Sequence, residues 1–550
     1  MNKVFVCLLI SIIGSSFSEP IDKSFILEKF MDEPKQLFKA YYALYEKELE
    51  YDINSEIGVK RFKVFSESVE FIKAKNKELG KKTYGITQFT DLTREEFKQK
   101  YLMKESVVER IIGETQEKRL PRKVNLEGIE VGEIDWRSKM NPAREQKACG
   151  SCWSFAAVAS IEGNYNIQYG TLYELSEQYL VDCDTEDNGC NGGYPTRTFP
   201  WIMRNGVKDL NDPSGRGTYK ASMGICRTRT EKQEAKNIVK GLDYCDKNCT
   251  MEQWINLLKE GPILVSMDGD DRALKDYKPE SLDNPWVPSY YSCNKINHAV
   301  TCVGVKMIDG KLHALVRNSW GKTWGYDGHF TVPLDNSCFI AESAFRPIVQ
   351  LKGESFPEPE CDTFYSDCNK NNRKEIKKCY GIPDAQKDIG FDIAGWSNLE
   401  DHHWNVFEKS QCRGKSDWKY KEQQCFATSW SRYRLKEYKS AANDDEKPAM
   451  GCLYLHSEPC FAGEQYRICG KVEDLTIHKD FDPSSILSVR FEPFISFPGS
   501  VVSAVFFEEK GFHGKACSLK NEKYYNLDEP ETEFFVECLK KAKSFAIIGY

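Results

Sequence analysis

Cysteine is distributed very unevenly along the 550-residue chain, and this distribution limits the fold more than any other feature. Cys7 stands alone near the start, and the other 20 of the 21 cysteines lie from Cys149 onward. Dense cysteine indicates domains that fold in an oxidising compartment and are held by disulfides. The chain therefore combines a long cysteine-free N-terminal part with a disulfide-rich body.

The first 18 residues have the pattern of a secretory signal peptide. One early lysine precedes an apolar run from Val4 to Ile13, and small residues stand at Ser16 and Ser18. We predict a signal peptide at 1–18, and a location in the secretory pathway, either a lysosome or other acidic vesicle or the outside of the cell. No later stretch reaches the roughly 20 apolar residues of a membrane anchor. A net charge of -7 gives no reason to expect a nucleic-acid partner.

Residues 19–130 are charged and have the pattern of helices. Phe62, Phe65, Val69 and Ile72 recur three and four residues apart, which predicts an amphipathic helix. Two interpretations fit a cysteine-free helical block between a signal peptide and a cysteine-rich body. It is a helical domain in its own right, or it is a pro-segment that is removed.

Beyond residue 130 the composition changes to tryptophan, glycine and regularly placed cysteine. Gly353–Glu360 contains two prolines and three acids and has the composition of a linker. We therefore predict a domain at 131–350, a cysteine-rich region of unknown fold at 351–450, and a β-rich domain at 451–550.

The last of these domains contains an internal repeat. Leu455–Tyr466 and Phe506–Cys517 superpose with a shift of 51 residues, which brings Phe461 onto Phe512. Each copy is a strand-like run followed by a tight turn with an aromatic residue and a glycine. The repeat predicts two β-hairpins of similar build in a small two-sheet module.

Cys149 and Cys152 stand three residues apart, which is compatible with a zinc site, a redox pair, a structural pair or two different roles. A zinc site lacks a second ligand pair at suitable spacing. In the alternative with two different roles, which we favour, Cys149 forms a disulfide and Cys152 is a free thiol. Ser151 is a candidate N-cap of a helix that ends at Gly170, so Cys152 would lie where the helix dipole favours a thiolate.

A reactive thiol needs a proton partner, and all eight histidines lie from His298 onward. His298 begins an apolar, strand-like run, a position at which a histidine is most often structural. Asn318 follows later in the chain and offers a carbonyl oxygen that could hold one imidazole nitrogen. Trp320 could shield that hydrogen bond from water.

The motifs CGSCW around Cys152, NHAV around His298 and NSWG around Asn318 stand in this order. With them the chain resembles the papain-like cysteine peptidases, and among these cathepsin L. The resemblance implies an α+β peptidase of two lobes, one helical and one like a β-barrel. It implies that Cys152 is the nucleophile, that His298 is its acid–base partner and that Asn318 orients the imidazole. Gln146 would complete the oxyanion hole.

The resemblance also implies disulfides; the pairs are Cys149–Cys190, Cys183–Cys226 and Cys293–Cys338. Cys245 and Cys249 are additional and could bridge each other, whereas Cys302 is expected to be a buried free thiol. Asn248 begins the only glycosylation sequon.

The substrate-binding positions that the resemblance implies are Gly192, Gly193, Tyr194, Pro195, Ser266, Ala299, Ser343 and Trp320. The glycines would let an extended peptide approach the backbone. The pocket for the second residue before the cut carries no charge, so we predict an apolar preference there. No histidine-pair loop that would block one end of the cleft is visible, which favours an endopeptidase.

Residues 19–130 resemble the inhibitory pro-segment of the same family, which implies an intramolecular inhibitor released by acidification or cleavage. The matching residues are Arg61, Phe65, Ile72, Asn76, Gly85, Phe89 and Asp91. The departures are Ile57, Ser68 and Thr87 in the pro-segment and Lys147, which replaces a glycine of the active-site stretch. We predict the cut between Asn125 and Glu133.

The repeat at 451–550 resembles the Greek-key motifs of βγ-crystallins, which implies an all-β domain that docks or stabilises, with an unknown partner. Its possible calcium motifs, Asp480–Ser485 and Lys540–Phe545, lack acidic positions, so we expect no metal and no other cofactor. An alternative is an inactive peptidase-like scaffold in which this domain is the binding module. The presence of all four catalytic positions favours an enzyme that acts on proteins or peptides.

Overall fold

A computed structural model of the chain describes residues 23–112, 126, 131–211, 217–227, 235–288 and 293–351. Beyond these it describes short segments, which are 362–365, 375–378, 395–397, 404–407, 416–419, 440–443, 452–457, 464–469, 471–472, 475, 481–482, 485–492, 502–509, 515–520, 523–524 and 533–549. The predicted signal peptide lies outside the described residues. None of the helices in the described part of the chain is long and apolar enough to cross a membrane.

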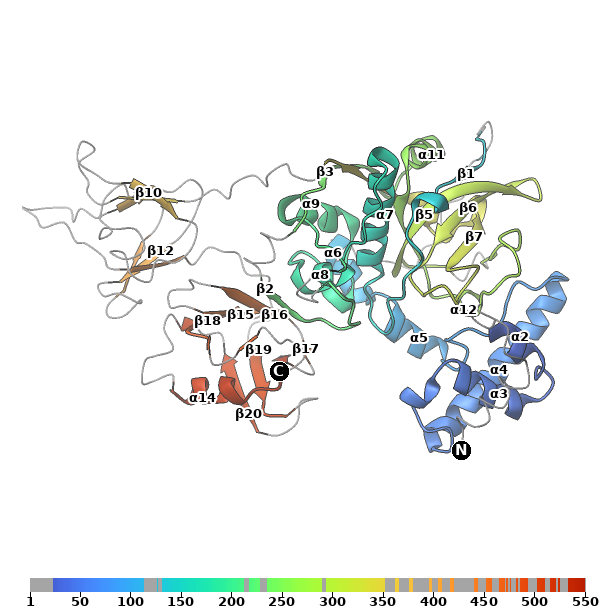
Figure 1. Ribbon diagram of the computed structural model, residues 1–550, viewed down its shortest axis with the longest axis horizontal. Coiled ribbons are helices and arrows are strands. Elements are labelled where there is room, and N and C mark those ends of the chain that lie inside the picture. The colour runs from blue at the N-terminus through green and yellow to red at the C-terminus, as the bar shows by residue number, and fades with distance from the viewer. Residues whose placement is uncertain are drawn as a thin grey trace, which may run out of the picture. The chain divides into compact units, whose positions relative to one another are not determined.

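The chain divides into two compact units. Figure 1 labels helices and strands of both. The first consists of Met1–Tyr173, Asn191–Pro195 and Gly241–Val349. The second consists of Glu174–Cys190, Thr196–Lys240 and Gln350–Tyr550.

The first unit begins with a set of helices. They are α2 (Lys23–Glu28), α3 (Pro34–Leu44), η1 (Lys47–Leu49), α4 (Glu56–Leu79), α5 (Arg94–Tyr101) and α6 (Glu105–Ile112). Ser55 caps α4 by accepting a hydrogen bond from the Gly58 N–H, and Gly80 ends it in the left-handed conformation. Phe65, Val69 and Ile72 are buried on one face of α4, so the amphipathic helix is confirmed.

Polar residues of the pro-segment motif hold these helices together. Arg61 pairs with Glu96 at 2.6 Å, and the Asp91 carboxylate accepts hydrogen bonds from Tyr41 and Tyr51. Asn76 accepts hydrogen bonds from the Tyr84 N–H and a neighbouring backbone N–H at the end of α4. The motif positions therefore serve the internal fold of this helical block.

The rest of the first unit packs one long helix, α7 (Cys152–Tyr169), against an antiparallel sheet. The strands are β1 (Ile134–Asp135), β3 (Val239–Cys245), β4 (Ile263–Met267), β5 (His298–Ile308), β6 (Lys311–Arg317), β7 (His329–Pro333) and β8 (Ala344–Val349). The sheet order is β3-β8-β4-β5-β6-β7, and β1 pairs with β5. The short helices are η2 (Arg137–Lys139), α11 (Met251–Glu260), α12 (Arg272–Lys275), η4 (Leu334–Asn336) and η5 (Ile340–Glu342).

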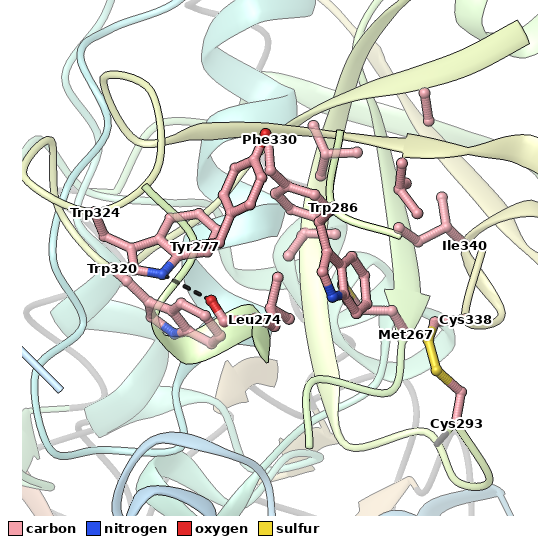
Figure 2. Close-up of a cluster of buried hydrophobic side chains, with 14 of the residues drawn as sticks. Met267, Leu274, Tyr277, Trp286, Cys293, Trp320, Trp324, Phe330, Cys338 and Ile340 are labelled. Atoms are coloured by element: carbon pink, nitrogen blue, oxygen red, sulfur yellow. Dashed lines mark hydrogen bonds between the residues drawn. A yellow bond between two sulfur atoms is a disulfide. The ribbon is translucent and has the colours of Figure 1, made fainter. Parts of the chain in front are cut away.

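An aromatic cluster fills the space beside this sheet (Figure 2). Trp320 and Trp324 meet edge to face with ring centroids 4.8 Å apart, and Trp324 donates to the Leu274 carbonyl at 3.1 Å. Tyr277 and Phe330 pack against Trp324. This cluster fixes the loop that carries Trp320, which matters for the site described below.

The second unit contains α8 (Glu177–Cys183), most of η3 (Gly189–Asn191) and most of α9 (Pro195–Asn205). Asn191 at the end of η3 and Pro195 at the start of α9 belong to the first unit. It also contains a five-stranded sheet, β2-β16-β15-β18-β21, and a four-stranded sheet, β17-β22-β19-β20. Their strands are β2 (Ile225–Arg227), β15 (Cys452–His456), β16 (Gln465–Cys469), β17 (Lys471–Val472), β18 (Ser488–Glu492), β19 (Val502–Phe507), β20 (Ala516–Lys520), β21 (Lys523–Tyr524) and β22 (Ser544–Gly549).

The internal repeat is visible in the register of two hairpins. In β15–β16, His456 lies opposite Gln465, and in β19–β20, Phe507 lies opposite Ala516. Each residue of the second pair is 51 positions after its counterpart in the first. The two predicted hairpins therefore form with the same register. Helix α14 (Glu533–Lys541) follows, so this region is not made of strands alone.

Two further three-stranded sheets lie between residues 362 and 443. Their strands are β9 (Asp362–Tyr365), β10 (Glu375–Lys378), β11 (Gly395–Ser397), β12 (Trp404–Phe407), β13 (Ser416–Lys419) and β14 (Ser440–Asn443). The predicted α+β organisation, with helices first and a sheet-containing domain after them, is confirmed for the first unit.

Candidate active site

Cys152 begins helix α7 and is fully buried. Its Sγ accepts a hydrogen bond from the Ala299 N–H at 3.4 Å, which places the sulfur beside the start of β5. Ser151 occupies the N-cap position as predicted, but its side chain makes no capping hydrogen bond to the helix. Among the described cysteines, Cys152 and Cys302 are the free thiols.

His298 and Asn318 are brought together by β5 and the end of β6. The His298 Nε2 lies 2.9 Å from the Asn318 Oδ1, which also accepts a hydrogen bond from the Ser319 N–H at 2.8 Å. Because this oxygen can only accept, His298 carries its proton on Nε2, and its Nδ1 is the basic nitrogen. The Nδ1 atom is buried and has no hydrogen-bond partner among the described residues. The imidazole stacks on Trp320 with centroids 4.9 Å apart.

Gln146 is held rigidly in the same region. Its Oε1 accepts a hydrogen bond from the Ser319 Oγ at 2.6 Å, so its amide nitrogen points the other way. The Nε2 donates to the Cys149 carbonyl at 2.7 Å and to the Tyr101 carbonyl at 2.9 Å. Tyr101 belongs to the N-terminal helical block, so that block supplies a carbonyl oxygen to the amide predicted to bind an oxyanion.

The chain after Tyr101 crosses the site in an extended conformation. The Met103 N–H donates to the Asn297 carbonyl at 2.9 Å, and the Lys104 N–H donates to the Asn191 carbonyl at 2.9 Å. A Cβ atom built on Gly192 would lie 3.0 Å from that of Met103. Asn297 directly precedes His298, so this segment covers the residues on which the predicted chemistry depends.

Burial under this segment decides the charge of the site. It raises the pKa of the Cys152 thiol to about 12, although backbone N–H groups, that of Ala299 first, oppose the rise. Burial lowers the pKa of His298 to about 4, although the Asn318 hydrogen bond opposes this. Thiol and imidazole are therefore both neutral here. The expectation of a readily ionised thiol at the helix end is wrong for this covered form, because the exclusion of water outweighs the helix dipole.

Comparison with known proteins bears on this arrangement. Residues 131–348 match the papain family of cysteine proteases, and residues 38–97 match the cathepsin propeptide inhibitor domain. Caricain from Carica papaya is 33% identical over 296 residues, which are 53% of this chain and 78% of caricain. The chain belongs to the papain family.

A second curated relative agrees with this assignment. Cysteine proteinase 3 of Entamoeba histolytica is 33% identical over 290 residues, covering 52% of this chain and 86% of that protein. Among solved structures, a recombinant stem bromelain precursor is 27% identical, covers 58% of this chain and 99% of its own, and has a TM-score of 0.47. By the family models and the curated relatives, the chain is a papain-like cysteine peptidase that carries an inhibitory pro-segment, which residues 38–97 of the helical block match.

The predicted substrate-binding residues of this papain-family domain are all buried. Ser266 and Ala299 are opposite each other in β4 and β5, and both are buried. The Tyr194 hydroxyl donates to Asp246 at 2.8 Å, and its ring meets that of Phe345 at 6.0 Å. Gly192 has a φ of 133°, a conformation that a side chain would strain. The remaining predicted positions, Gly193, Pro195 and Ser343, are also buried.

The disulfides follow the family pattern where the structure describes the pairing. Cys183 bonds to Cys226, Cys293 to Cys338, and the additional Cys245 to Cys249. Cys149 and Cys190 are each disulfide-bonded. Asn248 lies in the small loop that the Cys245–Cys249 bond closes, and its glycosylation stays a prediction.

Sequence reasoning missed several residues of the site. Ser319, which fixes the Gln146 amide, was signalled only by its place in the NSWG motif. The extended stretch Tyr101–Lys104 gave no signal, because it interacts mainly through backbone atoms. Lys147 adopts a left-handed φ of 51°, which explains why glycine is the unstrained residue at this position.

Proposed function

We propose that Cys152, His298, Asn318 and Gln146 are the catalytic residues of a cysteine endopeptidase made as an autoinhibited zymogen. The observation that carries this proposal is the hydrogen bond between His298 Nε2 and Asn318 Oδ1. It leaves the basic Nδ1 unpartnered among the described residues, and the residue after His298 donates to the Cys152 sulfur. The imidazole is thus prepared to take a proton from the thiol once the pro-segment leaves.

In the proposed reaction the His298 Nδ1 accepts the Cys152 proton, and the thiolate sulfur bonds to the carbonyl carbon of the peptide. The oxyanion accepts hydrogen bonds from the Cys152 N–H and from the Gln146 amide, which the Tyr101 carbonyl no longer occupies. The C–N bond then breaks, and the amine leaves with the proton from His298. Water, deprotonated by His298, hydrolyses the thioester and restores the thiol.

The proposed substrates are proteins and peptides with an apolar side chain two residues before the cut. Ser266, Ala299 and Ser343 are small and uncharged, and Tyr194 presents a ring packed on Phe345. A charged side chain placed among these buried groups would lose its hydration without gaining a partner.

The remaining parts of the proposal concern processing and location. The pro-segment would extend over residues 19–130 and be cut between Asn125 and Glu133, in the secretory pathway or an acidic vesicle. The equal register of the two hairpins supports a βγ-crystallin-like build at 451–550, where the domain would dock or stabilise. The scaffold alternative is less favoured, because all four catalytic positions are kept.

Labelling with a thiol-reactive peptide epoxide tests the nucleophile. We expect one label on Cys152 in the matured enzyme, and neither label nor peptide hydrolysis in Cys152→Ala. Cys302→Ala, which removes the other free thiol among the described cysteines, should keep both the label and the hydrolysis. Hydrolysis by the Cys152→Ala enzyme, or a label on Cys302, would refute the assignment.

A further inference from the structure

One strand of the second unit comes from the peptidase sequence, although the sheet it joins belongs to the C-terminal region. Strand β2 pairs antiparallel with β16, with Ile225 opposite Ile468, Cys226 opposite Arg467, and Arg227 opposite Tyr466. It thereby forms the edge of the five-stranded sheet that β15, β16, β18 and β21 continue (Figure 1). About 240 residues separate the two paired strands along the chain.

The two faces of β2 make different contacts. On one face, Ile225 is buried in the apolar core of the C-terminal domain. That core also contains Leu453, Leu455, Tyr466, Ile468, Phe491, Phe506 and Phe545. A residue of the peptidase sequence therefore completes a hydrophobic core that the C-terminal domain leaves open at this edge.

On the other face, Arg467 of β16 reaches toward helix α8. It is only 1% exposed, and its Nη2 donates to the Asp182 carbonyl at 2.7 Å. Burial raises the pKa of the neighbouring Asp184 carboxyl well above its usual range, and Asp187 adds to the rise, whereas the charge of Arg467 opposes it. A buried guanidinium of the C-terminal domain thus bonds to the backbone of α8 in the peptidase sequence.

Strand β2 is itself fixed to the peptidase side. The Cys183–Cys226 disulfide joins it to the end of α8. The Asp182 Oδ1 accepts a hydrogen bond from the Gly224 N–H at 2.6 Å, immediately before the strand begins. The edge that receives β16 is therefore held in place without any help from the C-terminal domain.

From this arrangement we propose that β2 is a docking strand to which residues 451–550 bind by strand addition, with Arg467 as a buried anchor. The backbone hydrogen bonds give affinity, and Ile225 and Arg467 fix the register, as in other cases of β-augmentation. The C-terminal domain is then a permanent, non-covalently bound part of the mature enzyme, even after cleavage of the connecting sequence. The attachment of residues 451–550 to β2 does not depend on whether the catalytic assignment is correct.

Cleavage of the predicted linker tests this docking. A recognition sequence for a specific protease is inserted between Gly353 and Glu360 of the full chain, and the protein is then cut. We expect two fragments that separate on a denaturing gel without reductant, yet elute together in gel filtration at both low and high salt. Immediate separation in gel filtration would overturn the proposal, and so would a disulfide that joins the fragments.

Single substitutions locate the contact. Arg467→Ala should weaken the binding of the cut fragments on the order of 100-fold, because it removes the buried donor to the Asp182 carbonyl and leaves a cavity in its place. Lys540→Ala is the matched control, since this lysine is exposed and pairs with Glu537 on its own helix, and it should leave the retention unchanged. Equal retention of the Arg467→Ala and wild-type fragments would contradict the anchoring role.

A variant on the peptidase side separates docking from misfolding. Ile225→Ala changes the peptidase fragment and leaves the sequence of the C-terminal fragment unchanged. Release of the C-terminal fragment in this variant therefore cannot result from misfolding of that fragment. We expect Ile225→Ala to weaken retention tenfold or more, while peptide hydrolysis stays at the wild-type level. Wild-type retention in this variant would contradict the docking strand.

Discussion

The pro-segment and the C-terminal domain both lie against peptidase residues, but their contacts differ in kind. The pro-segment combines ion pairs near the surface, such as Arg94 with Asp270, with buried contacts, such as the ring of Phe97 5.1 Å from that of Trp320. The C-terminal domain shares a sheet and a core with β2 and buries Arg467. Exposed ion pairs are weak and are screened by salt, whereas a shared core is neither. The attachment of the pro-segment therefore includes ion pairs that acid and salt weaken, whereas the attachment of the C-terminal domain includes backbone pairing within one sheet.

A buried polar cluster also joins the pro-segment to the peptidase. The Thr90 Oγ1 donates to the Asp276 carboxylate at 2.8 Å, and Lys275 pairs with the same carboxylate at 2.8 Å. All three side chains are buried. This cluster should therefore contribute more to inhibition than any of the exposed pairs.

The largest expected effect separates catalysis from attachment. Cys152→Ala should lower kcat/KM at least on the order of 10⁴-fold, because no other group replaces the nucleophile. It should leave the retention of the C-terminal domain after linker cleavage unchanged. Peptide hydrolysis and gel filtration on the same protein measure both, and a loss of retention would mean that the two regions are coupled.

The next effect concerns the core of the pro-segment. Phe65 is fully buried, with its ring centroid 4.7 Å from that of Tyr41. Phe65→Ala should destabilise the helical block by about 3–5 kcal/mol and cause hydrolysis by the uncleaved zymogen at neutral pH. Ile57→Ala on the same helix is the control, because Ile57 is 55% exposed and its loss should have little effect. Thermal unfolding monitors stability in both.

A smaller effect is expected at the buried cluster. Thr90→Val keeps the shape but removes the hydroxyl from Asp276, which should weaken inhibition about tenfold. Lys82→Ala breaks an exposed pair with Glu280 and should weaken it less than threefold. Residual hydrolysis by the uncleaved zymogens gives the order of the two effects, and equal effects would contradict the larger role of the buried cluster.

The smallest effect is the pH dependence of Glu105. Burial alone would raise its pKa, but hydrogen bonds from Lys295 and Lys98 outweigh this and hold the pKa below its ordinary value of 4.5. Its ion pairs therefore stabilise the inhibited form above about pH 4.5 and are lost as the pH falls through the lowered pKa. Glu105→Gln should speed processing at pH 6 roughly two- to fivefold and reduce its acceleration by acid.

The exposed Glu78 provides the control for this titration. It pairs with Lys75 within α4, and it is 64% exposed. Glu78→Gln should process at the wild-type rate across the same pH range. An equal acceleration in this variant would show that Glu105 has no specific role in the acid response.

Features encoded by neighbouring residues could be predicted from the sequence. The spacing of Phe65, Val69 and Ile72 identified α4, and the 51-residue repeat identified two hairpins. Motifs identified Gln146, His298 and Asn318, which the structure places around one region. In each case the signal lies within a short stretch of chain.

Features that depend on distant partners could not be predicted. Arg467 meets Asp182 across 285 positions, and β2 has three residues, too few to show an alternating pattern. The pKa of Cys152 depends on whether Tyr101–Lys104 covers it, which no local pattern encodes. Tertiary burial outweighs the local helix-end effect at this thiol.

The three-residue strand β2 also has a consequence for producing the peptidase by itself. A chain that stops at residue 350 would leave the open side of β2 without its neighbour and would expose Ile225 to solvent. Unpaired strand edges next to an apolar side chain recruit other chains and promote aggregation. Low solubility of such a truncated enzyme would then result from the uncovered edge of β2 rather than from a defect in the catalytic site.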